Sequence, residues 1–133
     1  MNGSPAQHKA EYVIDGAACS TLSGAAAEFT AALGLLSPWR GNLDAFNDIL
    51  HGGFGTPDQG FTLIWKRSDL SRQRLGYSET IKWLEERVQH CHPDNVPSFQ
   101  RDLKAARRGE GQTLFDMLIE IIHHHDDIEL RLE

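Results

Sequence analysis

The run FTLIWK, residues 61–66, decides the fold, because it holds five uncharged residues in a row before its terminal lysine. A short and largely apolar run with β-branched and aromatic members is typical of a strand that is buried on both faces. Helical patterns precede and follow this run along the chain. We therefore expect residues 61–66 to form the central strand of a small parallel sheet whose crossover connections are helices.

Two more segments, near the ends of the chain, have strand patterns. AEYVIDG, residues 10–16, is rich in β-formers and ends in an Asp-Gly turn, and IELRL, residues 128–132, alternates apolar with polar side chains. The predicted fold class is therefore α/β, with strands separated by helices. Periodicity and capping residues predict helices over residues 21–34, 43–51, 78–91, 98–111 and 113–125, and a helical turn capped by Ser68 or Asp69.

Length and composition are those of one ordinary domain. The chain has 133 residues, of which 40% are hydrophobic and 24% charged, and no apolar run approaches the roughly 18 residues of a membrane span. Residues 1–9 lack the pattern of a secretory signal and indicate a flexible tail. Cys19 and Cys91 lack the spacing of a disulfide framework or a zinc site. We expect a single cytoplasmic domain over residues 1–133.

The formal charge of −6 is unevenly spread along the chain. Residues 61–108 carry ten basic and six acidic groups, whereas residues 1–60 carry two and six and residues 109–133 carry one and seven. Direct nucleic-acid binding needs a net basic surface, so the two acidic ends argue against it, whereas an acidic face favours a basic partner. Phosphate-loop, dinucleotide and nucleophile-elbow motifs are missing from the sequence, so we expect neither a cofactor nor enzymatic activity.

A second stretch, WRGNLDAFNDIL (residues 39–50), places Asp44 and Asp48 one helical turn apart on the polar side of a predicted helix. Like charges at this spacing destabilise an isolated helix, and Asp48 lies toward the unfavourable end of the helix dipole. A solvated polar face is one interpretation. An acid/base pair is another, although nothing nearby would separate the two pKa values. A cation from another molecule would relieve the repulsion.

This stretch resembles the signature of the barstar family, in which an aromatic-Gly loop leads into a helix with an Asn, two aspartates four residues apart and an apolar pair. The order of the flanking strands and helices agrees, so that the resemblance covers residues 10–75 and 113–133. It implies a three-stranded parallel sheet packed against helices. It also implies a cytoplasmic inhibitor, without catalytic residues, of a basic extracellular-type ribonuclease or a related toxin.

The resemblance also implies a partner-binding surface. Asp44 and Asp48 match the acidic positions that engage the nuclease active site, and Asp48 matches the position that replaces the substrate phosphate. Glu120 falls on a third acidic contact position, and Trp39 matches a loop aromatic that packs on the partner. Asn47 stands where these inhibitors carry a contacting tryptophan. The predicted partner-binding residues are Trp39, Arg40, Gly41, Asn42, Asp44, Asn47, Asp48 and Glu120.

Residues 76–112 lie outside the resemblance and indicate a helical insertion within the domain. Together with Asn47 they leave an alternative open, namely a barstar-fold interaction or regulatory domain that has lost inhibition and associates with itself or another protein. A solvated face is expected for the basic stripe of Arg101, Lys104, Arg107 and Arg108. For His90-Cys91-His92 and His123-His124-His125 we favour helix ends, where histidine suits the dipole, over metal ligation, which needs convergent ligands.

Overall fold

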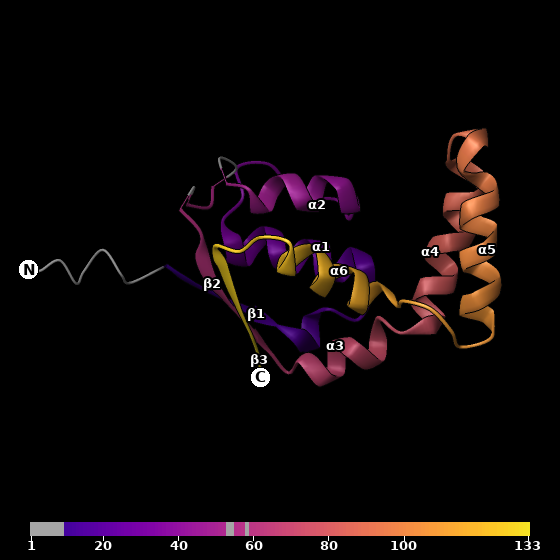
Figure 1. Ribbon diagram of the computed structural model, residues 1–133. Helices are drawn as coiled ribbons and strands as arrows, with labels where there is room; N and C mark the ends of the chain where they lie inside the picture. Colours follow the sequence, from indigo (N-terminus) through magenta and orange to yellow (C-terminus); the bar gives the residue numbers. More distant parts are fainter. Residues whose placement is uncertain (1–9, 53–54, 58) are drawn as a thin grey trace, which may run out of the picture.

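The computed structural model describes residues 10–52, 55–57 and 59–133, and it confirms the predicted α/β class (Figure 1). Three strands, β1 (Glu11–Asp15), β2 (Phe61–Lys66) and β3 (Ile128–Leu132), form one sheet with β2 in the middle. Both pairings are parallel, and Val13, Ile64 and Arg131 lie side by side across the sheet. The central position predicted for residues 61–66 is therefore confirmed, whereas the expected tail at residues 1–9 lies outside the described residues.

Helices supply the crossovers between the strands. They are α1 (Leu22–Leu33), α2 (Leu43–Leu50), α3 (Ser68–Arg74), α4 (Tyr77–His90), α5 (Val96–Arg107) and α6 (Leu114–His123), with short 3₁₀ turns at Gly16–Ala18 and Pro93–Asn95. In Figure 1, α1, α2 and α6 lie together beside the sheet, whereas α4 and α5 stand as a pair away from it. The first helix is capped by Thr21 and α6 by Thr113, whose side chain forms a capping box with Asp116.

The main core lies between the sheet and the helices packed beside it. Trp65, on β2, is fully buried, and its ring contacts Phe29 of α1 and Phe115 of α6, each at a centroid distance of 5.3 Å. Its indole Nε1 donates to the hydroxyl of Ser71 at 2.9 Å, which satisfies the one polar group on this side chain. Burying each such aromatic side chain stabilises the fold by about 1.5–3 kcal/mol.

The start of α3 lacks the side-chain cap that was expected from Ser68 or Asp69. Ser68 is already the first helical residue, and its hydroxyl donates to the backbone carbonyl of Glu133 at 3.1 Å. Arg67 precedes it in the left-handed conformation, with φ of 52°, and its guanidinium donates to Asp15 at 2.8 Å. A Cβ at Gly16 would lie 2.2 Å from the carbonyl oxygen of Arg67, so only glycine fits there. Tertiary contacts therefore replace the local cap.

The helices α4 and α5 pack against each other around a small core of their own, formed by Leu84, Leu103 and Ala106. Two hydrogen bonds fix the base of α4 to the rest of the fold, and a third joins it to the end of the 76–112 segment. The Glu79 carboxylate accepts from the backbone N–H of Leu22 at 3.0 Å, Thr80 Oγ1 accepts from Leu114 at 2.8 Å, and the Tyr77 hydroxyl donates to Gly111 at 2.8 Å. The expected helix pair within residues 76–112 is present, and we call it the hairpin.

Candidate partner-binding surface

The loop before α2 sets where that helix begins. Asn42 has extended backbone angles, and its side-chain oxygen accepts from the backbone N–H of Ala45 at 2.9 Å, as the sequence predicts for a helix cap. Gly41, with φ of 96°, occupies a conformation that disfavours other residues. The indole of Trp39 donates to the backbone carbonyl of Asn42 at 2.7 Å. These local contacts hold the first turn of α2 in a fixed direction.

The predicted polar and apolar sides of α2 are present in the structure. Phe46, Ile49 and Leu50 are buried, whereas Asp44 and Asp48 are exposed. Within residues 10–52, 55–57 and 59–133, neither carboxylate forms a salt bridge. Asp44 lies in the first turn, where the helix dipole favours a negative charge, but Asp48 has no such compensation. The helix therefore presents two outward carboxylates, which we call the acidic face.

The position of Trp39 corrects an expectation. Its side chain is only 4% exposed and belongs to the main core, so the indole does not offer a surface on which a partner could pack. The ring stacks on Phe46 at a centroid distance of 4.6 Å and meets Phe29 edge to face at 5.9 Å. The signature places an aromatic in this loop, but burial depends on the space beneath the loop, which local sequence does not specify.

Asn47 faces another helix rather than open solvent. Its side-chain oxygen lies 2.8 Å from Nε2 of His125, which follows α6, and His125 is itself only 7% exposed. The ring of His51, which caps the end of α2, meets the His125 ring edge to face at 4.6 Å. Burial, followed by the positive field of His51, lowers the pKa of His125 below its ordinary value. Asn47 therefore positions α2 against α6, a role that the sequence did not indicate.

Glu120 lies on a different helix from the two aspartates. It is exposed on α6, where it lines a shallow cavity of about 280 Å³ together with Arg72 of α3 and His123. The guanidinium of Arg72 sits over the Phe115 ring at 4.6 Å from its centroid. This cavity shares no residue with the acidic face, so the structure does not join Glu120 to Asp44 and Asp48 in one pocket.

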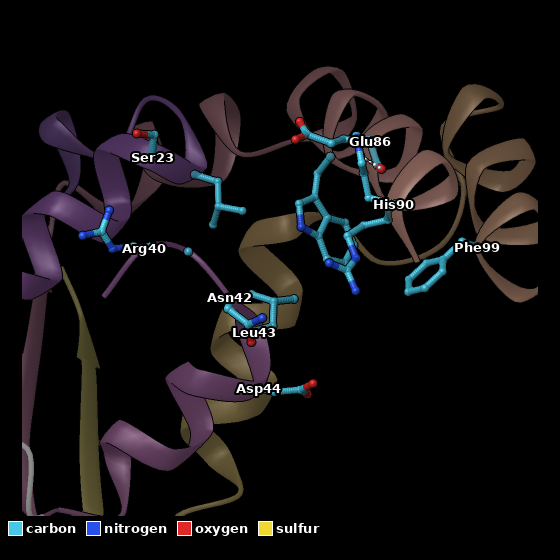
Figure 2. A pocket seen from close by; sticks show the side chains of 12 residues that line it. Ser23, Arg40, Asn42, Leu43, Asp44, Glu86, His90 and Phe99 are labelled. Atoms are coloured by element: carbon cyan, nitrogen blue, oxygen red, sulfur yellow. Dashed lines mark hydrogen bonds between the residues drawn. The ribbon is translucent and has the colours of Figure 1, made fainter. Parts of the chain in front are cut away.

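A groove of about 720 Å³ joins the start of α2 to the hairpin, and four predicted residues line it, namely Arg40, Gly41, Asn42 and Asp44. Figure 2 shows Asn42 and Leu43 on one side, Glu86 and His90 of α4 opposite, and Phe99 of α5 beyond them. The α4 residues that line the groove are Trp83, Glu86, Arg87 and His90. Their spacing at i, i+3, i+4 and i+7 marks one helix face, which was the available sequence signal.

The histidine and cysteine side chains that the sequence raised as possible metal ligands lie in the following surroundings. His90 contacts the carbonyl of Glu86 through Nδ1 at 3.0 Å, and His92 accepts from the backbone N–H of Asp94 at 3.1 Å. Burial raises the pKa of the Cys19 thiol to about 12. In the part of the chain that the structure describes, no cluster of three histidine, cysteine or acidic residues could hold a metal ion. The same residues contain no helix with the length and hydropathy needed to cross a bilayer.

Comparison with known proteins agrees with the fold and with the signature on α2. No curated protein matches the chain significantly. The family model described as barstar, the barnase inhibitor, matches residues 10–103. This match includes the sheet strands β1 and β2, the acidic face and α4, and it ends within α5, before α6 and β3. The chain belongs to the barstar family, whose members are inhibitors of ribonucleases such as barnase rather than enzymes.

Proposed function

We propose that this protein binds a basic ribonuclease of the barnase type, or a related toxin, and blocks its active site with the acidic face of α2. The single observation that carries the proposal is the state of Asp44 and Asp48, which are exposed and form no salt bridge with any described residue. An inhibitor of this kind would act in the cytoplasm, as an antitoxin or immunity protein.

Charge complementarity supports this mode of inhibition. A ribonuclease stabilises the charge of its phosphoryl transition state with arginine, lysine and histidine side chains. Two carboxylates on a short helix, with Phe46 and Leu50 anchored beneath them, are held ready to pair with those cations. Because the inhibitor face is already ordered, association loses little conformational freedom at the contact, and opposite charges also accelerate the encounter.

The test compares two variants, Asp48→Ala and, as a control, Glu129→Ala. For each variant, the inhibition of barnase and the affinity for barnase are measured. Glu129 is an exposed acid on β3 that pairs with Arg131, away from α2. We expect Asp48→Ala to weaken binding by more than about 2 kcal/mol, the level of an interface hot spot, because a nuclease cation is left unpaired. The control should stay near wild type. Equal losses in the two variants would refute the acidic face as the inhibitory site.

The alternative is an interaction or regulatory domain that keeps the barstar fold without inhibiting a nuclease. Two observations favour it. Asn47, at the position of a contacting tryptophan in the family signature, is turned to His125, and the hairpin adds a surface of its own. In that case the protein would associate with itself or another chain through residues 76–112, and barnase would not be inhibited by the wild-type protein.

A further inference from the structure

The groove between α2 and the hairpin extends the acidic face without a break. Asp44 belongs to both, and Gly41 and Asn42 line the groove directly before it. A protein whose cleft covers Asp44 and Asp48 therefore meets the rim of the groove at the first turn of α2. The hairpin supplies the opposite wall through Trp83, Glu86, Arg87 and His90.

The chemistry of the groove differs from that of the acidic face. Its two arginines, Arg40 and Arg87, balance its two acids, Asp44 and Glu86, so its formal charge is zero with His90 neutral. The remaining walls include aliphatic and aromatic side chains, namely Leu22, Leu43, Trp83 and Phe99. Neutral, partly aromatic concavities accept apolar or aromatic anchors with a few polar contacts, and they do not attract strongly basic segments.

The groove is also a fixed feature of the fold rather than a gap between loose parts. Leu22, which lines it from α1, donates its backbone N–H to Glu79 of α4 at 3.0 Å. Trp83 packs against both the main core and the small core of the hairpin, and its ring meets Phe99 edge to face at 6.3 Å. The guanidinium of Arg87 sits over the Phe99 ring at 5.5 Å from its centroid. Both walls are therefore ordered before any partner arrives.

We propose that this groove is a second contact surface for the same ribonuclease, and that it receives an uncharged loop with an aromatic or aliphatic side chain from the rim of the nuclease cleft. The inference rests on the proposed function, because the acidic face brings the nuclease to the groove. The acidic face supplies charge pairing, and the groove supplies selection among ribonucleases by the shape and polarity of that loop.

The test fills the groove with a bulky side chain. His90→Trp introduces an indole at an exposed lining position, and Gln89→Trp introduces the same group one residue earlier on α4, at an exposed position outside the lining. Affinity for barnase is measured for both, with circular dichroism to verify the fold. We expect His90→Trp to weaken binding about tenfold or more and Gln89→Trp to leave it unchanged, because only the first excludes the nuclease loop.

Asp48→Ala separates the two proposals. If Asp48→Ala weakens binding but His90→Trp and Gln89→Trp bind barnase equally, the groove is not a contact surface and the inhibitory face stands. If the wild-type protein does not bind barnase, or if Asp48→Ala does not weaken binding, the proposed function fails and the groove inference fails with it. In ¹⁵N-labelled protein, the indole N–H resonance of Trp83 should shift when unlabelled barnase is added, and an unchanged resonance at saturation would also overturn the inference.

Discussion

Single residues at the start of α2 determine how the acidic face is presented. Asn42 caps the helix through its side chain and receives the Trp39 indole on its backbone carbonyl, so two hydrogen bonds meet at one residue. Gly41 permits the turn because its φ of 96° is disfavoured for other residues. The direction of Asp44, two residues later, therefore depends on a cap and on a backbone conformation.

At this scale we predict the effect of removing the cap. Asn42→Ala should lower the free energy of unfolding by about 1 kcal/mol, because the N–H of Ala45 loses its side-chain acceptor. Asn42→Asp keeps an acceptor at the same place and should stay close to wild type. Urea unfolding followed by circular dichroism measures both variants. If Asn42→Ala and Asn42→Asp had equal stabilities, the side chain would not act as the cap.

Among the elements, α2 packs against α6, and this contact helps to hold the acidic face on the core. Phe46 and Leu50 of α2 are buried in the main core beneath that face. The polar part of the contact is the pair of Asn47 and His125, with the His51 ring beside it. Burial is the largest cause of the lowered pKa of His125, His51 and His124 lower it further, and Asp127 opposes them.

We predict a pH dependence of stability from this histidine. The pKa of His125 is lower in the folded chain than its ordinary value of 6.5, so the unfolded chain binds the proton at higher pH. The free energy of unfolding should therefore fall as the pH decreases below about 6.5, by at most about 1.4 kcal/mol per pH unit for one proton, until the folded-state pKa is reached.

Urea unfolding between pH 5 and pH 8 measures this loss. His125→Gln, which retains a donor for Asn47 but does not titrate, should flatten the dependence. His124→Gln removes only the smallest of the causes that act on the pKa of His125, so it should flatten the dependence much less. An unchanged dependence in His125→Gln would show that other groups titrate in this range.

At the scale of the whole molecule, the structure contains a large core and a small one. The main core joins the sheet to α1, α2 and α6, whereas the small core of the hairpin consists of three buried apolar side chains, those of Leu84, Leu103 and Ala106. The hairpin is held to the rest of the fold near the base of α4, by Glu79 and Thr80. Local stability follows the apolar contacts of each part, so the two parts should not open with equal free energies.

Native-state hydrogen exchange tests this difference. The backbone amides of α5 should exchange faster than those of β2 and α1, because α5 can separate from α4 without exposing the main core. Exchange is measured by two-dimensional NMR on the full chain, with α1 as the internal reference for a helix packed on the main core. Equal protection of α5 and α1 would mean that the hairpin unfolds only with the whole molecule.

The periodicity of the sequence predicted most of the helices and strands. The apolar run of β2 predicted a central buried strand, and the helical periodicity of residues 43–51 correctly placed Asp44 and Asp48 on the polar side, away from the buried Phe46 and Ile49. Both features are properties of one element, because side-chain direction repeats every two residues in a strand and about every 3.6 in a helix. The hydrogen-bonding side chain of Asn42 likewise acts within its own turn.

Only the tertiary structure determined which residues each face of an element contacts. Trp39 proved to be core because Phe29 and Phe46 enclose it, and Asn47 faces His125, 78 residues further along the chain. The groove arises because Glu79 fixes α4 beside the first residue of α1. A sequence pattern indicates which side of an element is apolar. The surface that packs against that side is formed by segments distant in the chain, which only folding brings together.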